Sequence, residues 1–230
     1  MATRTPAAPP AVKICCIASH DEARLAVAAG AHAIGLVSAM PSGPGVIGES
    51  LIADIASAMP QGVETFLLTA HVSAEAIAAQ HRRCLTTTVQ LVDRLERREL
   101  ETLRVRLPDV RLVQVVHVLD DSAVDEARAA APLVDAILLD SGDPRRTVKA
   151  LGGTGRVHDW SISRRVRDAV ACPVWLAGGL DADNAARAVD AVVPFGLDVC
   201  SGVRRDGRLD PRRLHAFFAA VARARSEAAS

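Results

Sequence analysis

The chain has 230 residues, of which 50% are hydrophobic, so it can bury one large core, and single α/β barrels commonly have this length. Its 27 basic and 27 acidic residues cancel, which excludes the strong positive field of a protein that binds nucleic acid or an anionic membrane surface. Five cysteines without CxxC spacing argue against a disulfide scaffold and against a zinc site. No apolar run approaches the roughly 20 residues that span a bilayer.

Both ends of the chain are expected to lie outside the folded domain. Residues 1–10 hold three prolines among alanines and predict a disordered leader, and residues 226–230 predict a frayed tail. The segment 11–225 shows no linker and is expected to form one domain. Because the start of the chain also lacks the apolar core of a secretory signal, we expect a reduced, cytoplasmic protein.

Short apolar runs alternate with longer stretches of helical spacing throughout this domain. We predict eight strands, at 12–17, 33–37, 65–69, 88–91, 112–117, 136–139, 174–177 and 196–199. Their nearly continuous hydrophobicity is typical of strands that are buried on both faces. We predict helices at 20–29, 48–58, 73–83, 94–106, 121–131, 161–169, 181–192 and 211–225. Eight strand and helix units predict an α/β fold, a single (β/α)8 TIM barrel.

A thiol and a carboxyl group are expected at the mouth of this barrel. Side chains at the C-terminal ends of the strands converge on one mouth, where Cys15 would come from the first strand and Asp140 from the sixth. The two are therefore candidates for a general base and a general acid. Lys13, one of only two lysines, is expected either to pair with a carboxylate inside the barrel or to act electrostatically near Cys15.

Glycine-rich loops follow the last three predicted strands. Glycines let backbone N–H groups approach a ligand, and barrels frequently bind phosphate with the loops after strands seven and eight. The glycines could instead serve as turns and helix caps, but their place at adjacent strand ends favours a phosphorylated substrate. The predicted phosphate-binding residues are Gly153, Gly155, Gly178, Gly179, Ser201 and Gly202.

Five motifs in order resemble those of the phosphoribosylanthranilate isomerase family over nearly the whole chain. They are Val12-Lys13-Ile14-Cys15, Leu138-Leu139-Asp140-Ser141, Gly152-Gly153-Thr154-Gly155, Leu176-Ala177-Gly178-Gly179-Leu180 and Asp198-Val199-Cys200-Ser201-Gly202-Val203. The resemblance implies an Amadori rearrangement in tryptophan biosynthesis, from N-(5-phosphoribosyl)anthranilate to 1-(2-carboxyphenylamino)-1-deoxyribulose 5-phosphate, without metal or coenzyme. By resemblance, Asp140 donates a proton to the furanose ring oxygen and Cys15 removes the proton from C2′.

Cys15 and Asp140 each have an alternative structural role. A lone cysteine is most often a small buried hydrophobe, and Asp140 could cap the start of the following segment, but the motifs favour the chemical roles. Gln90, His117 and Asp198 are further candidates at the mouth. Histidines in such positions are more often structural. We expect a monomer or a simple homodimer.

The chain departs from the family pattern at four places. Cys16 replaces a glycine, and Val92-Asp93 replaces His-Gly after the fourth strand. Arg204 replaces a glutamate and is a candidate ligand for phosphate or carboxylate, although exposed loop arginines usually bind neither. The loop between Pro41 and Gly48 lacks the arginine with which the family holds the anthranilate carboxylate.

These departures leave the substrate open at the level of sequence. The first reading is a phosphoribosylanthranilate isomerase with an unusual carboxylate site. The second is a paralogous aldose–ketose isomerase for another phosphorylated sugar or aminosugar, and the third is a non-catalytic barrel that binds a phosphorylated metabolite. We favour the first, because the resemblance runs over the whole chain while the carboxylate loop is one altered segment.

Overall fold

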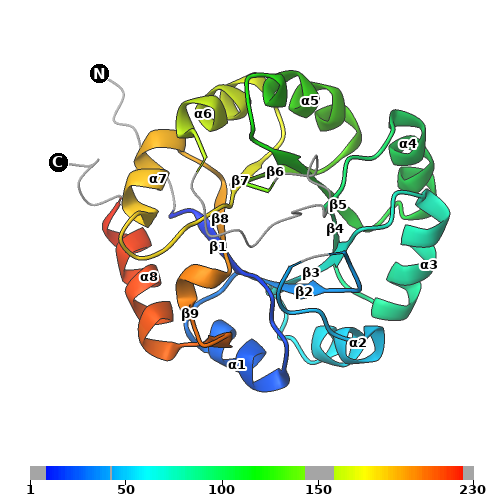
Figure 1. Ribbon diagram of the computed structural model, residues 1–230. Coiled ribbons are helices and arrows are strands. Elements are labelled where there is room, and N and C mark those ends of the chain that lie inside the picture. Colours follow the sequence, from blue (N-terminus) through cyan, green and yellow to red (C-terminus); the bar gives the residue numbers. More distant parts are fainter. Residues whose placement is uncertain (1–8, 42, 143–157, 225–230) are drawn as a thin grey trace.

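Eight parallel strands close into a barrel in the order β1 to β8, and the helices surround it (Figure 1). The computed structural model describes residues 9–41, 43–142 and 158–224. The strands are β1 (Ala11–Ile14), β2 (Ala33–Val37), β3 (Glu64–Thr69), β4 (Thr88–Leu91), β5 (Arg111–His117), β6 (Ala136–Asp140), β7 (Val174–Leu176) and β8 (Gly196–Val199). The predicted α/β barrel is thereby confirmed.

A helix follows each strand along the chain. The α-helices are α1 (His20–Ala28), α2 (Glu49–Ser57), α3 (Ala74–Cys84), α4 (Arg97–Arg106), α5 (Ser122–Ala130), α6 (Trp160–Ala169), α7 (Ala185–Val192) and α8 (Pro211–Arg223). Two short 3-10 helices, η1 (Ala131–Leu133) and η2 (Ser201–Val203), and a small hairpin of β9 (Arg204–Arg205) and β10 (Arg208–Leu209) complete the described elements. None of the helices described here is long and apolar enough to cross a membrane.

Two element boundaries differ from the prediction in ways that affect the site. β1 ends at Ile14 rather than at residue 17, and Cys16 adopts a positive φ of 63° that no strand accommodates. Cys15 therefore lies on the rim of the barrel. α7 begins at Ala185 rather than at residue 181, because the Asp181 and Asn184 side chains bond to each other's backbone N–H groups and form a turn.

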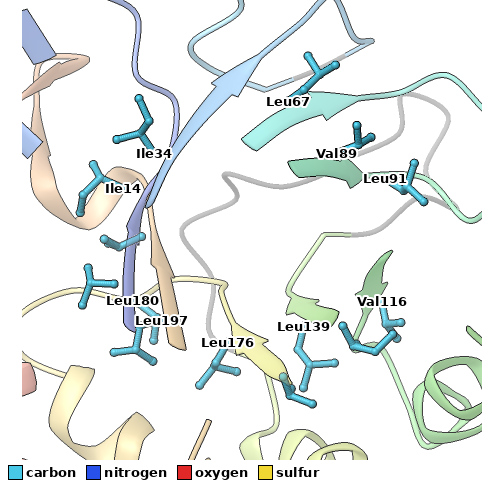
Figure 2. Close-up of a cluster of buried hydrophobic side chains, with 14 of the residues drawn as sticks. Ile14, Ile34, Leu67, Val89, Leu91, Val116, Leu139, Leu176, Leu180 and Leu197 are labelled. Carbon is cyan, nitrogen blue, oxygen red and sulfur yellow. The ribbon is translucent and has the colours of Figure 1, made fainter. Parts of the chain in front are cut away.

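The hydrophobic side chains form two layers, as strand alternation requires. Outward-facing residues such as Ile14, Leu67 and Leu139 pack against the helices (Figure 2). Inside the barrel, Phe66 and Trp175 meet edge to face with ring centroids 5.8 Å apart. Gly196 makes room for the indole, since a Cβ there would lie 2.4 Å from a Trp175 ring carbon.

The aromatic layer supports the polar layer of the site. Gly196, which faces Trp175, precedes Asp198 by two residues on the same strand, so the aromatic rings lie one layer nearer the N-terminal end of the barrel. The side chains nearer the C-terminal mouth therefore rest on a rigid apolar floor.

Candidate active site

Cys15 and Asp140 both lie at the C-terminal end of the barrel. Cys15 follows β1 directly, and Asp140 is the last residue of β6. Each shares its strand face with residues that point into the barrel, since Lys13 precedes Cys15 by two residues and Leu138 precedes Asp140 by two. Both side chains are buried, with 6% of Cys15 and 7% of Asp140 exposed. The fold therefore directs the predicted base and the predicted acid to the same mouth.

Burial shapes the electrostatics of Asp140. Removal from water raises the pKa of the carboxyl group above its ordinary value. The neighbouring His117, the Ser141 backbone N–H and Lys13 act in the opposite direction, but the net shift stays upward. Asp140 thus keeps its proton to a higher pH than an exposed aspartate does, which suits a group that must donate a proton.

Lys13 is a fully buried cation at the centre of the site. Its Nζ lies 2.8 Å from Asp198 Oδ2 and 2.9 Å from Gln90 Oε1, and it is 0% exposed. The same nitrogen lies 3.7 Å from Cys15 Sγ and 5.0 Å from the centroid of the Phe66 ring. Both sequence-based alternatives therefore hold, because Lys13 pairs with a carboxylate and also contacts the thiol.

The charge of Lys13 is stable in this position. Burial by itself lowers the pKa of a lysine, but the attraction of Asp198 and of Cys15 outweighs it and raises the pKa of Lys13 above its ordinary value. The ammonium group and a Cys15 thiolate attract each other at this distance, and the low-dielectric interior strengthens that attraction. The site therefore holds a permanent positive charge beside the candidate base.

Gly35 provides the space that Lys13 and Cys15 occupy, and sequence reasoning missed it. A Cβ at Gly35 would lie 2.8 Å from Cys15 Sγ and 3.1 Å from Lys13 Cε. Because β2 pairs with β1, any larger residue at this position would push both side chains out of place. A glycine inside a buried strand, where it weakens the strand, was the available signal.

Glycines also bring the loops after β6, β7 and β8 together. A Cβ at Gly178, which has a φ of 87°, would lie 2.9 Å from Ser141 Cβ. A Cβ at Gly202 would lie 2.0 Å from the carbonyl oxygen of Leu180. Gly178, Gly179, Ser201 and Gly202 are thus assembled at one edge of the mouth. Gly153 and Gly155 lie outside the described residues.

The other candidates at the mouth have identifiable partners. Gln90 binds Lys13 through its amide oxygen. His117 pairs in register with Asp140, and its Nε2 lies 3.1 Å from the carbonyl oxygen of Val92. Within the described ranges, His117 Nδ1 and Asp198 Oδ1 are buried without a hydrogen-bond partner. Arg204 Nε, beside the end of β1, is a further buried nitrogen without a partner among the described residues.

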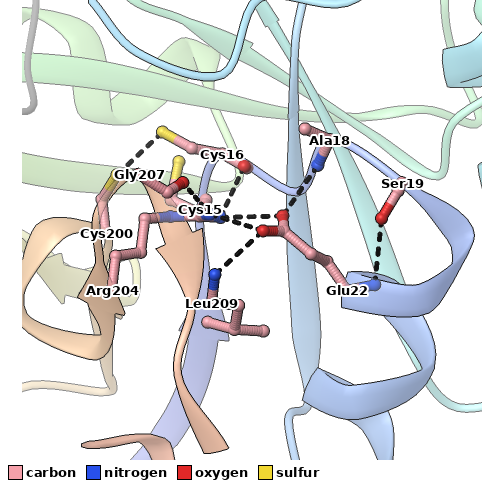
Figure 3. Close-up of polar contacts among 9 residues, drawn as sticks. All are labelled: Cys15, Cys16, Ala18, Ser19, Glu22, Cys200, Arg204, Gly207 and Leu209. Atoms are coloured by element: carbon pink, nitrogen blue, oxygen red, sulfur yellow. Dashed lines mark hydrogen bonds and ion pairs between the residues drawn. The ribbon is translucent and has the colours of Figure 1, made fainter.

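Arg204 is not an exposed loop residue, which corrects the sequence-based interpretation. Only 8% of it is exposed, and its Nη1 lies 2.8 Å from Glu22 Oε1 at the start of α1. Its Nη2 donates to the carbonyl oxygens of Cys15 at 3.2 Å and Cys16 at 2.6 Å (Figure 3). Arg204 therefore secures the end of β1 through both terminal nitrogens of its guanidinium.

The loop that follows β2 packs on the end of β1. Val46 bridges to Val37, and a Cβ at Gly45 would lie 2.6 Å from Cys16 Cβ. Between Pro41 and Gly48 the chain carries no arginine, so this loop supplies no cation. The part of the chain with described coordinates also contains no group of three or more histidine, cysteine, aspartate or glutamate residues arranged to hold a metal ion.

Known proteins are similar to this chain over most of its length. Residues 12–220 match the family model described as N-(5'phosphoribosyl)anthranilate (PRA) isomerase. The N-(5'-phosphoribosyl)anthranilate isomerase of Methanocella arvoryzae is 33% identical over 203 residues, which cover 88% of this chain and 93% of the relative. That of Haloferax volcanii is 36% identical over 216 residues, 93% of this chain and 94% of the relative.

Solved structures of the same name share the fold. Phosphoribosyl anthranilate isomerase from Thermotoga maritima superposes with a TM-score of 0.77 at 27% identity and covers 93% of this chain and 98% of its own. Another structure, a complex with reduced 1-(o-carboxyphenylamino)-1-deoxyribulose 5-phosphate, has a TM-score of 0.75 at 25% identity, with coverage of 93% and 98%. This chain belongs to the N-(5'-phosphoribosyl)anthranilate isomerase family.

Proposed function

We propose that this isomerase converts N-(5-phosphoribosyl)anthranilate to 1-(2-carboxyphenylamino)-1-deoxyribulose 5-phosphate with its own side chains, without metal or coenzyme. The observation that carries the proposal is the placement of Cys15 and Asp140 on the mouth of one barrel, with the Lys13 ammonium 3.7 Å from the thiol. The reaction needs only proton transfers, and one acid and one base can perform them.

The first step opens the sugar ring. Asp140 donates its proton to the furanose ring oxygen, the bond from that oxygen to C1′ breaks, and the aniline nitrogen supplies the electron pair that forms the Schiff base. The upward shift of the Asp140 pKa through burial supports this role, because the carboxyl group must be protonated before the step. The carboxylate that results lies near Lys13 and His117, which attract it.

The second step moves hydrogen from C2′ to C1′. The Cys15 thiolate removes the C2′ proton, and the Schiff base accepts the electron pair, which gives an enolamine. The enolamine gains a proton at C1′, its C2′ hydroxyl loses a proton, and the ketone forms. C1′ is reduced while C2′ is oxidised, so the reaction is an internal oxidation and reduction without an external electron acceptor, which places the enzyme among the intramolecular oxidoreductases.

We assign the substrate phosphate to the loops after β7 and β8. Gly178, Gly179, Ser201 and Gly202 lie together there, and backbone N–H groups in such glycine-rich loops are ready donors to phosphate oxygens. The solved relative that holds a ligand with a 5-phosphate supports a phosphorylated substrate. The comparisons favour this function over the paralogous isomerase and over a non-catalytic barrel.

Two broader assignments accompany this proposal. Residues 11–225 are taken as one domain, in agreement with a family match over residues 12–220. A reducing compartment, the cytoplasm, suits the protein because all five cysteines are free thiols.

Turnover by the parent and two variants tests the proposal. Freshly prepared N-(5-phosphoribosyl)anthranilate is mixed with the full chain, and the loss of anthranilate-type fluorescence is followed. Cys15→Ala and Asp140→Asn should each lower kcat by about 10²-fold or more, as expected for loss of a positioned base or acid. Cys172→Ser is the matched control, because Cys172 precedes β7 at the opposite end of the barrel and its loss should leave kcat unchanged.

Two results would contradict the proposal. Parent-like turnover by Cys15→Ala or Asp140→Asn would remove that residue from the mechanism. Folded parent protein that fails to turn over the substrate at any concentration would refute the assignment of the substrate.

A further inference from the structure

A pair of thiols, Cys16 and Cys200, lies beside the candidate active site and takes no part in the mechanism above. Cys16 follows Cys15, and Cys200 follows β8. Their sulfur atoms are 2.9 Å apart, within hydrogen-bond distance, as the dashed line between them in Figure 3 shows. Because β1 and β8 pair in parallel, with Ile14 opposite Val199, the two sulfurs meet across the seam where the barrel closes.

The backbone at Cys16 indicates that this thiol is not an ordinary filler of the core. Its φ of 63° lies in the left-handed region that glycine adopts at no steric cost and that other residues rarely adopt. This chain instead carries a buried sulfur there, with 6% of the residue exposed. The side chain is therefore kept in a backbone conformation that disfavours it, at the one place where it meets Cys200.

The surroundings of Cys200 favour reactivity. Its hydrogen bond with Cys16 lowers the pKa of the Cys200 thiol against the effect of burial, and the positive charge of Arg204 lowers it further. A thiolate is the reactive form of cysteine, and cationic neighbours are typical of reactive thiols. Cys200 is only partly buried.

Both cysteines line one pocket. It has a volume of about 310 Å³, and its lining includes Cys16, Cys200, Arg204, Pro44 and Gly45. The volume is many times that of a water-sized molecule, which occupies about 30 Å³ in the liquid. A peroxide can therefore reach the thiol pair without unfolding of the barrel.

We propose that Cys16 and Cys200 form an oxidisable dithiol whose disulfide reversibly lowers the activity of the enzyme. The oxidant is a peroxide. The Cys200 thiolate attacks one peroxide oxygen and becomes a sulfenic acid, the other oxygen leaves as hydroxide and takes up a proton, and the Cys16 thiol then displaces water from the sulfenic sulfur. In total the two thiols lose two protons and two electrons, and hydrogen peroxide becomes two waters. A thiol reductant reverses the bond by exchange.

Bond formation requires only a small movement with a direct effect on the site. A disulfide bond is about 2.05 Å long, so the two sulfurs, now 2.9 Å apart, must approach each other by about 1 Å. Cys15 adjoins one of them in the chain and Ser201 adjoins the other. A shift of about 1 Å in catalytic geometry can lower a rate by about 10²-fold. The loss of activity rests on the function proposed above, whereas formation of the disulfide does not.

Peptide mapping and turnover of the full chain test the two parts separately. Reduced protein is treated with a small excess of hydrogen peroxide, free thiols are alkylated, and tryptic peptides are analysed without reduction. We expect peptide 14–24 joined to peptide 188–204, with two hydrogen masses lost and with Cys15 alkylated. Turnover should fall at least about ten-fold and return with dithiothreitol.

Cys200→Ser and Cys16→Gly are the decisive variants. Both should match the reduced parent in turnover, form no joined peptide and keep their activity at the peroxide dose that inactivates the parent. Cys172→Ser should behave as the parent does. The proposed dithiol is refuted if oxidised, folded protein lacks the joined peptide, or if Cys15 takes the place of Cys16 or Cys200 in it. The proposed effect on activity is refuted if the disulfide forms while turnover is unchanged. Absence of turnover in the reduced parent would instead refute the proposed function.

Discussion

The ion pair between Arg204 and Glu22 should contribute more to stability than any exposed pair of this protein. The Arg204 guanidinium contacts Glu22 with both terminal nitrogens and also donates to the carbonyl oxygens of Cys15, Cys16 and Gly207. Glu22 in turn accepts the backbone N–H groups of two other segments. One residue from the loop after β8 thus holds the end of β1 and the start of α1 (Figure 3).

The expected loss of stability in Arg204→Ala follows from the Glu22 charge, which stays buried without its partner. Removal of one partner of a buried ion pair costs about 3–5 kcal/mol, because the other charge stays buried without compensation. Glu22 is 15% exposed, so water offsets part of this cost. We therefore expect a loss of about 3 kcal/mol. For a domain of this length that loss lowers Tm by about 6–12 °C.

Chemical unfolding followed by tryptophan fluorescence at pH 7 measures this loss. Arg205→Ala is the matched control, since Arg205 is 61% exposed and lies 3.4 Å from Asp210, and its loss should cost less than about 0.5 kcal/mol. Addition of Glu22→Ala to Arg204→Ala should cost little more, because the two residues share one interaction. Equal losses in Arg204→Ala and Arg205→Ala, or additive losses in the double variant, would refute the reasoning.

The pH dependence of the same pair has a definite sign. Burial raises the pKa of Glu22, but the bonds from Arg204 and from two backbone N–H groups outweigh it and hold the pKa below its ordinary value. The unfolded state then binds the proton more readily, so the contribution of the pair is complete above the unfolded pKa of about 4.3 and is lost as the pH falls through the lower folded value. The difference between the parent and Arg204→Ala should narrow below about pH 4.

Three further predictions concern the site. Gly35→Ala should lower kcat about ten-fold or more because its Cβ would displace the Cys15 thiol, whereas Gly48→Ala, with no neighbour within 4 Å, should leave kinetic constants unchanged. Lys13→Met should lower the free energy of unfolding in denaturant by about 3–5 kcal/mol, because Asp198 loses the cation with which it pairs. A second change, Asp198→Asn, should restore much of that stability without restoring kcat. Asp140→Asn should be inactive yet at least as stable as the parent at pH 8. At that pH the folded parent must keep a buried carboxyl group whose pKa is raised, and its ionisation costs stability. A variant less stable than the parent would contradict this.

The sequence was sufficient for the barrel because local patterns determine it. Short, mostly apolar runs at regular spacing identify β2, β4 and β8 with their observed limits, and every residue of these three strands is buried. The motifs likewise placed Cys15 and Asp140 at strand ends. Several other limits differ from the prediction, and of these the limits of β1 and α7 depend on a positive φ at Cys16 and on side-chain bonds between Asp181 and Asn184.

Contacts across the barrel were beyond sequence reasoning. Nothing local in Arg204 indicates burial, because its partner Glu22 lies 182 residues away in the chain and the pairing exists only once β8 closes against β1. The glycine at position 35 inside a buried strand is a local signal, but the side chains for which it makes room, Cys15 and Lys13, are identified only by the pairing of β2 with β1.

Three of the four departures of this chain from the family pattern lie in contact with one another, namely Cys16, the loop after β2 and Arg204. Cys16 adds a side chain on which the loop after β2 packs, and Gly45 is required there because a Cβ would lie 2.6 Å from Cys16 Cβ. Arg204, the second departure, binds the carbonyl oxygen of Cys16. Cys16 therefore contacts both the loop after β2 and Arg204. An arginine inserted into this loop would therefore meet a surface that the Cys16 side chain helps to form.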